Sequence, residues 1–252
     1  MQCICTITTV TQLTPLKTPQ TPKPMFLISD RIKAIIFDLD DTLYDCSGTL
    51  VLKSKRLAAK IISKAIKCSE TEALRLQLEL EGRFGPKADI PHEIANQYNL
   101  PEDFCEEISN IINTLGVEGA TLFPDAMASI DELKRTGYKL FLVTFGNREM
   151  QEKKIRALGL ERAFDKIIIT DNPLGKEKCF REILTMYDLE PEQVLCVGDK
   201  IKDEIEVGGK LGMHTVLIKH GRHYNFYKSE ITENAPYTFI TKISDLLRGD
   251  KN

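Results

Sequence analysis

The sequence of 252 residues predicts an α/β fold in which helices cover both faces of a parallel sheet. Two observations lead to this prediction. Short apolar segments alternate with helix-like segments from residue 32 onward, and glycines follow three of the predicted helices, where a C-terminal cap is expected. A long helical stretch also separates the first predicted strand from Pro124. It is too long for an ordinary crossover, so we expect an inserted helical subdomain.

Five strands are predicted from short apolar runs bounded by polar or turn-forming residues. They cover residues 33–38, 139–144, 166–170, 193–197 and 214–218. Four helices of the same domain are predicted from apolar residues at helical spacing, over residues 125–136, 148–158, 177–187 and 203–211. A last element, with a strand at 238–240 and a helix at 244–248, is expected to close this domain.

The expected domain division places the inserted subdomain at residues 47–120 and the α/β domain at 25–46 and 121–252. Helices are predicted inside the insertion over residues 50–67, 70–82, 91–98 and 102–115. The first of them has a basic stripe at helical spacing, made of Lys53, Arg56, Lys60, Lys64 and Lys67. A solvated helix face is the favoured interpretation, and a positive wall that steers an anionic substrate is the alternative.

The N-terminal segment and the composition limit the classes of function that the sequence allows. Residues 1–24 are rich in Thr and Pro and lack acidic residues, so we expect a disordered tail or a functional start at Met25. The net charge of -3 does not suggest a nucleic-acid partner, and no apolar run approaches transmembrane length, so no membrane partner is expected. Seven scattered cysteines indicate reduced thiols and a cytoplasmic location. His220 and His223 are interpreted as parts of a polar loop, because no partner ligand is evident.

Two carboxylates, Asp38 and Asp40, stand at the end of the first predicted strand. Side chains alternate along a strand, so the two acids point the same way if the chain stays extended between them. The carboxyl ends of parallel strands are where open α/β sheets bind ligands. The pair could share a divalent cation, or one acid could attack while the other moves protons. An Asp-rich turn is the simpler alternative.

Three further polar residues fall at or just after predicted strand ends. Thr144 ends the second strand, Lys176 follows Gly175 where a helix begins, and Asp199 follows an apolar strand. Taken singly, Thr144 could be an ordinary strand residue, Lys176 a surface charge and Asp199 a helix cap. Together they suit attack on a phosphate, because a hydroxyl and an ammonium group can bind its oxygens while carboxylates hold a hard cation such as Mg²⁺.

With these motifs in this order, the chain resembles the haloacid dehalogenase superfamily, in its phosphatase branch with a helical cap of the C1 type, over about residues 32–248. The resemblance implies a Rossmann-like sheet of order 5-4-1-2-3. It also implies that Asp38 forms an aspartyl-phosphate and that Asp40 serves as acid and then base. The implied metal ligands are the Asp38 carboxylate, the backbone carbonyl of Asp40 and the Asp199 carboxylate.

The chain departs from the pattern of many relatives at two positions. Phe145 stands after Thr144 where Asn is common, and Glu177 follows Lys176 where Pro is common. Lys178 is therefore a competing candidate for the phosphate-binding lysine, although Lys176 is favoured. A secondary acid is expected from two neighbouring residues, Asp203 or Glu204. The presence of Asp40 argues against carbon–halogen chemistry, since true dehalogenases lack that acid.

The expected function is a Mg²⁺-dependent phosphatase that acts on a small phosphorylated metabolite. A helical cap fits this expectation, because a closing lid excludes large substrates and bulk water. A phosphomutase of the same superfamily is the first alternative. A receiver-like signalling protein and a non-catalytic phosphate-binding protein are less favoured, because the insertion is present and all four motif positions are retained.

Overall fold

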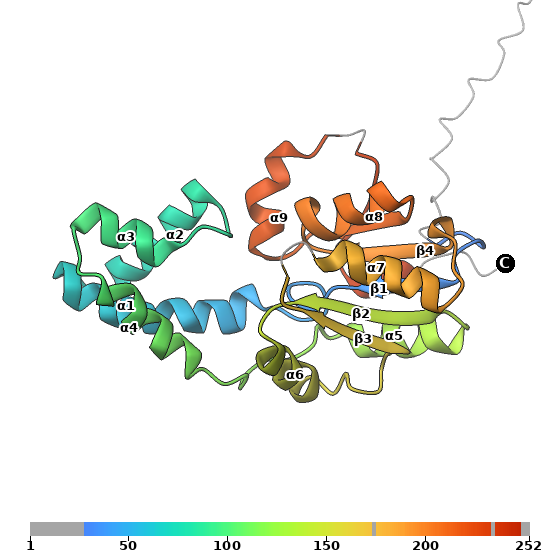
Figure 1. The fold of residues 1–252 in the computed structure, drawn as a ribbon, viewed down its shortest axis with the longest axis horizontal. Coiled ribbons are helices and arrows are strands. Elements are labelled where there is room, and N and C mark those ends of the chain that lie inside the picture. The colour runs from blue at the N-terminus through green and yellow to red at the C-terminus, as the bar shows by residue number, and fades with distance from the viewer. Residues whose placement is uncertain (1–27, 173–174, 233–234, 248–252) are drawn as a thin grey trace, which may run out of the picture.

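The computed structural model describes residues 28–172, 175–232 and 235–247, so the expected disordered tail at residues 1–24 lies outside the described residues. Six parallel strands form one sheet in the order β3-β2-β1-β4-β5-β6 (Figure 1). Their bounds are β1 Ala34–Phe37, β2 Lys139–Phe145, β3 Lys166–Thr170, β4 Val194–Gly198, β5 His214–Ile218 and β6 Thr238–Ile240. The predicted α/β class is therefore confirmed.

The expected strand order of 5-4-1-2-3 is incomplete. The first five strands keep that relative order, but β6 adds a sixth strand at the free edge of β5. Thr238 pairs with Val216 and Ile240 pairs with Ile218. A strand of three residues is too short for the alternation of side chains to indicate sheet membership, so its place is set by pairing and not by a sequence pattern.

Strand β1 lies at the centre of the sheet and all four of its residues are buried. Ile35 and Phe37 belong to one hydrophobic cluster, and Ala34 and Ile36 belong to another. This alternation assigns the two clusters to the two faces of the sheet. Helices α5 (Ala126–Arg135) and α6 (Arg148–Ala157) contribute to the first cluster, and α7 (Gly175–Met186) and α8 (Glu206–Leu211) to the second. A central strand covered on both faces holds the residues at its C-terminal end rigidly.

The inserted segment forms four helices, α1 (Leu52–Ile66), α2 (Glu70–Phe84), α3 (Ile90–Tyr98) and α4 (Asp103–Asn113). Figure 1 shows them as a group beside the α/β core. They enclose a hydrophobic cluster of their own, which includes Ile62, Ala73, Ile94 and Ile108. This separate cluster supports our proposed division into a cap at residues 47–120 and a core at 25–46 and 121–252.

A short helix, α9 (Gly221–Tyr227), follows β5, so the interpretation of His220 and His223 as a polar loop is wrong for His223. Gly, Asn and aromatic residues give this segment weak helix propensity, and tertiary packing overrides that weakness. The ring of Phe226 lies against Gly85 in the turn between α2 and α3. The helix is therefore a contact between core and cap. Within the described residues, no helix is long and apolar enough to cross a membrane.

Candidate active site

Asp38 directly follows β1 and is almost completely buried. Its Oδ1 accepts a hydrogen bond from Lys176 Nζ at 2.8 Å, and its Oδ2 accepts one from Lys200 Nζ at 2.9 Å. Burial acts to raise the pKa of the Asp38 carboxyl. The two ammonium groups outweigh that effect and hold the pKa well below its usual range. Asp38 is therefore an ionised carboxylate held in a fixed position between two positive charges.

The structure separates the two candidate lysines of the third motif. Lys176 is the second residue of α7, and its side chain is buried. Its ammonium group also contacts the carboxylate of Glu204. Lys178 lies on the exposed side of the same helix. Only Lys176 of the two is brought to Asp38, as the strand-to-helix turn at Gly175 indicated.

Asp199 follows β4 and is fully buried, yet neither of its carboxylate oxygens accepts a hydrogen bond within the described part of the chain. The ammonium group of Lys200 lies 3.4 Å from its Oδ1 as an ion pair. Burial raises the pKa of Asp199 to about 7. A buried carboxylate without hydrogen bonds is costly, so this residue has spare oxygen ligands that a cation would satisfy.

Ligand atoms of three buried acids, Asp38, Asp199 and Glu204, lie within 4.8 Å of one another. Oε2 of Glu204 likewise has no hydrogen-bond partner among the described residues. Asp203, the other candidate for the secondary acid, does not belong to this group of three, and its carboxylate lies 3.9 Å from Lys176 Nζ. The oxygen donors suit a hard divalent cation, so the residues present fit the metal that the sequence predicts.

Asp40 is held by helix α6 and by the loop after β1. Both of its carboxylate oxygens lie 2.9 Å from Lys154 Nζ, and its Oδ1 accepts a hydrogen bond of 2.5 Å from the Tyr44 hydroxyl. Gln151 donates to Oδ2 at 3.2 Å. Burial acts to raise the pKa of Asp40, and the Lys154 ammonium group outweighs it, so the pKa is lowered. In this arrangement Asp40 is ionised.

Thr144 lies in β2 with a buried hydroxyl group that accepts a hydrogen bond of 2.7 Å from Gln151 Nε2. Gln151 therefore links Thr144 to Asp40, and this link was not predicted from the sequence. A signal was present, because Gln151 and Lys154 are polar residues spaced i, i+3 on the face of α6 that also carries the core residue Ile155. Lys200, next to Asp199, was not predicted either, because a charged residue after a strand is usually exposed on the surface.

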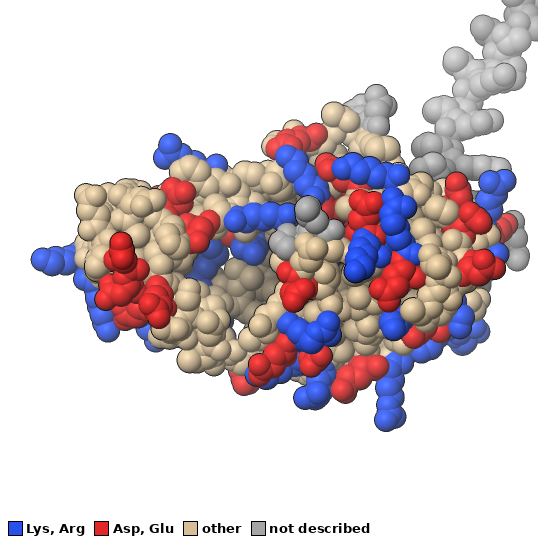
Figure 2. Space-filling view, in the orientation of Figure 1, with Lys and Arg blue, Asp and Glu red and all other residues tan. Residues whose placement is uncertain are grey.

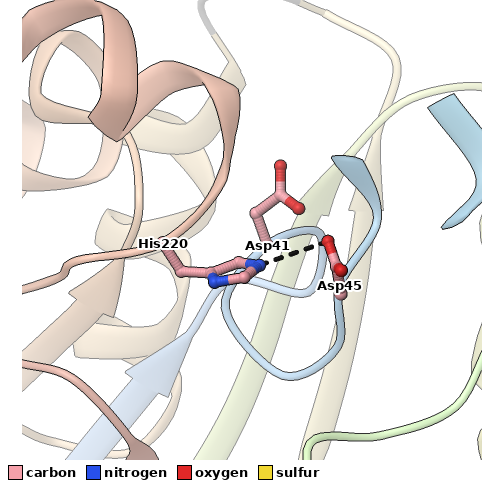
Figure 3. A group of neighbouring side chains, drawn as sticks. All are labelled: Asp41, Asp45 and His220. Carbon is pink, nitrogen blue, oxygen red and sulfur yellow. Dashed lines mark hydrogen bonds and ion pairs between the residues drawn. The ribbon is translucent and has the colours of Figure 1, made fainter. Parts of the chain in front are cut away.

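The loop after β1 is fastened to the start of α9. Asp41 has a φ of 60° and accepts hydrogen bonds from the backbone and hydroxyl groups of Ser47. Nε2 of His220 lies 3.2 Å from Oδ1 of Asp45, and Figure 3 shows this pair beside Asp41. A Cβ at Gly221 would lie 2.5 Å from Cβ of Asp41, so only glycine fits there. Ligand atoms of Asp41, Asp45 and His220 lie within 4.8 Å of one another, so the expectation that His220 has no partner ligand is wrong. Ser47 donates hydrogen bonds to both oxygens of Asp41, so we interpret this cluster as one that fastens the loop.

A cavity of about 470 Å³ opens in front of these residues. Asp40, Lys200 and Asp203 lie on its core side, and residues of the cap and of α9 complete it. The side chains of the basic stripe on α1 are exposed and do not belong to this lining. Their placement agrees with the favoured interpretation of a solvated helix face.

Comparison with known proteins gives consistent matches. A family model described as haloacid dehalogenase-like hydrolase matches residues 32–212. The chain is 30% identical over 225 residues to a glyceraldehyde 3-phosphate phosphatase of Pyrococcus furiosus, covering 86% of this chain and 92% of that protein. It is 24% identical over 204 residues to the N-acylneuraminate-9-phosphatase of Rattus norvegicus, covering 74% and 82%. A predicted phosphoglycolate phosphatase from Haemophilus somnus shares the fold, with a TM-score of 0.64, 22% identity, and coverage of 86% and 97%.

Proposed function

This chain belongs to the haloacid dehalogenase-like hydrolase family, and on that premise we propose that it hydrolyses a small phosphorylated metabolite through an aspartyl-phosphate on Asp38. The observation that carries the proposal is the buried, ionised Asp38 between two ammonium groups, beside the unsatisfied carboxylate of Asp199. The relatives named as phosphatases for glyceraldehyde 3-phosphate and N-acylneuraminate support a small metabolite as substrate.

In the first step, a carboxylate oxygen of Asp38 forms a bond to phosphorus while the bond from phosphorus to the alcohol oxygen breaks. Negative charge on the phosphoryl group would repel the attacking carboxylate. Lys176 and Lys200 reduce that repulsion, because their ammonium groups already lie at the two oxygens of Asp38. The hydroxyl of Thr144 is our proposed further contact for a phosphoryl oxygen.

Asp40 carries the proton in both steps of the proposal. It protonates the leaving alcohol and then takes a proton from the water that attacks phosphorus, which releases phosphate and restores Asp38. An acid must hold a proton, whereas the ammonium group of Lys154 favours the ionised form of Asp40. The contact between Lys154 and Asp40 therefore has to loosen when substrate binds.

The proposed cation is Mg²⁺, held by the carboxylates of Asp38 and Asp199 and by the backbone carbonyl of Asp40, with Glu204 at the edge of the same group. When bound it would neutralise charge on the phosphoryl group. Without it, the acids of the group are balanced only in part by Lys176 and Lys200.

The experiment that tests this function measures inorganic phosphate released from a panel of small phosphorylated metabolites and from an aryl phosphate. We expect release with Mg²⁺ and none in excess chelator. Full activity in chelator would contradict the proposed cation. Isomerisation of a sugar phosphate without release of phosphate would instead indicate the alternative, a phosphomutase.

A cytoplasmic location remains part of the proposal. It is supported by the cysteines of the described residues, which are free thiols: Cys46, Cys68, Cys105, Cys179 and Cys196. Free thiols at several sites suit a reducing compartment.

A further inference from the structure

Besides the acids Asp40, Asp41 and Asp203, the cavity has basic side chains that come from the cap and from α9. Lys87 and Arg222 line it together with His223, and we call these three residues the cationic wall after the two that are charged. Lys87 lies in the turn between α2 and α3, whereas Arg222 and His223 belong to α9. In the space-filling view the surface is hollowed between cap and core, and blue Lys and Arg side chains gather beside the hollow (Figure 2).

Among the described residues, the ion pairs of the wall balance its charge only in part. Arg222 pairs with Glu81 at 2.8 Å, but the same carboxylate oxygen of Glu81 is also 3.4 Å from Lys55 Nζ. The single negative charge of Glu81 is therefore shared between Arg222 and Lys55. Lys87 makes no ion pair within residues 28–172, 175–232 and 235–247. On the side formed by the cap and α9, Lys55, Arg222 and Lys87 exceed the single charge of Glu81, whereas the acids of the lining, Asp40, Asp41 and Asp203, belong to the core. A local excess of positive charge attracts an anionic group of a ligand.

Burial and the neighbouring positive charges change the pKa of His223. Its side chain is almost fully buried, and burial followed by the charges of Lys200, Arg222 and Lys87 lowers its pKa to about 3. A neutral imidazole adds a hydrogen-bonding group to the wall without a further charge.

The cap and the core hold the wall together. The turn that carries Lys87 begins at Gly85, which has a φ of +94° and packs against the ring of Phe226 on α9. Arg222 reaches from α9 to Glu81 on α2. The cationic wall is thus assembled from both domains, in the same cavity that Asp40 and Lys200 line.

We infer that the cationic wall selects phosphate monoesters whose alcohol part carries a second anionic group, either a carboxylate or another phosphate. This inference rests on the proposed function and adds a substrate class to it. Apolar contacts from Val51, Pro86 and Phe145 would hold the short carbon chain between the two anionic groups. A neutral alcohol part would leave the excess charge of the wall uncompensated.

The test compares kcat/KM for matched substrates that differ only in the second anionic group. 3-Phosphoglycerate is compared with glycerol 3-phosphate for a carboxylate, and fructose 1,6-bisphosphate with fructose 6-phosphate for a phosphate. We expect at least one anionic member to be preferred by about tenfold or more, which is the size of one hydrogen bond to a charged group. The pair that shows the preference identifies the anion.

The variant Lys87→Met keeps side-chain length and removes the charge, and Lys60→Met is the matched control, an exposed lysine of the cap outside the cavity. We expect Lys87→Met to reduce the preference several-fold and Lys60→Met to keep it. Equal turnover of charged and neutral members, or an unchanged preference in Lys87→Met, would overturn the inference. Hydrolysis of an aryl phosphate separates this result from failure of the proposed function, because a protein that is not a phosphatase would hydrolyse neither.

Discussion

At the scale of single residues, the sequence indicated which side chains meet but not how they are held. Asp38, Thr144 and Asp199 come together because they follow or end neighbouring parallel strands, whose carboxyl ends share one edge of the sheet. Lys154 and Lys200 could not be placed in the same way. A charged residue on a helix or a loop is expected to face solvent. Only the packing of α6 and the turn after β4 shows that these two ammonium groups point inward.

The variant Asp38→Asn is expected to lose nearly all activity while it keeps the fold. The amide has a similar shape but is a poor nucleophile, so kcat should fall by about 10⁴-fold or more. The measurement is phosphate release at saturating substrate, with circular dichroism to verify folding. Asp131→Asn, at an exposed position of α5, is the control and should behave like the wild type. Activity near the wild-type level in Asp38→Asn would exclude Asp38 as the nucleophile.

The variant Asp199→Asn is expected to stabilise the metal-free protein and to abolish its response to Mg²⁺. Asp199 is a buried carboxylate without hydrogen bonds, and removing its charge should raise the free energy of unfolding by about 1–3 kcal/mol. Thermal unfolding in chelator and in Mg²⁺ measures both effects. A lower Tm of the variant in chelator, or a rise in Tm with Mg²⁺ as large as that of the wild type, would contradict the assignment.

His223 is expected to make the protein less stable in mild acid. Burial and nearby cations lower its folded pKa to about 3, whereas the unfolded chain has a pKa near 6.5, so the unfolded state binds the proton first. This destabilisation is negligible above about pH 7.5 and grows as pH falls through 6.5 towards 3, reaching about 2 kcal/mol at pH 5. Denaturant unfolding of wild type and His223→Gln should therefore give curves that diverge between about pH 7.5 and 5. Parallel pH profiles would show that His223 is not held neutral.

At the scale of elements, strands and helices were largely predictable, and the exceptions have local causes. Helix α1 begins after a π-helical turn at Ser47–Val51, which shifts its start from the predicted residue 50. Helix α9 was not expected, because its composition has weak helix propensity and contact with the cap stabilises it. Strand β6 was too short to count as a member of the sheet. Each exception depends on tertiary contacts that a local pattern does not contain.

The turn between α2 and α3 should be sensitive to substitution at Gly85. A Cβ there meets a positive φ and the Phe226 ring at 3.3 Å, whereas Gly119 has a positive φ of 89° with nothing within 4 Å. Gly85→Ala should therefore cost more stability than Gly119→Ala, which costs about 1 kcal/mol from backbone strain. Chemical denaturation of the two variants measures the difference. Equal losses would mean that the ring contact does not constrain the turn.

At the scale of the whole molecule, the expected membership of the family and the expected class of phosphomonoester hydrolase are confirmed by the comparisons. The motif residues lie on the core, at residues 38–40, 144, 176 and 199, whereas the cap adds Lys87 and apolar contacts to the cavity. This placement supports our proposal that the core carries out the chemistry and that the cap and α9 select the substrate. The motifs indicated the core residues, whereas Lys87 and Arg222 could not be predicted because their place depends on how the cap sits against α9.

The central claim is that phosphate passes through a covalent bond to Asp38. The most direct measurement is to quench the enzyme during turnover of its best substrate, reduce the acyl phosphate with borohydride and locate the product by peptide mass spectrometry. We expect reduction of the Asp38 side chain to the alcohol, only in samples that contained substrate and Mg²⁺. Phosphate release without any modification of Asp38, or with modification at another carboxylate, would contradict the account.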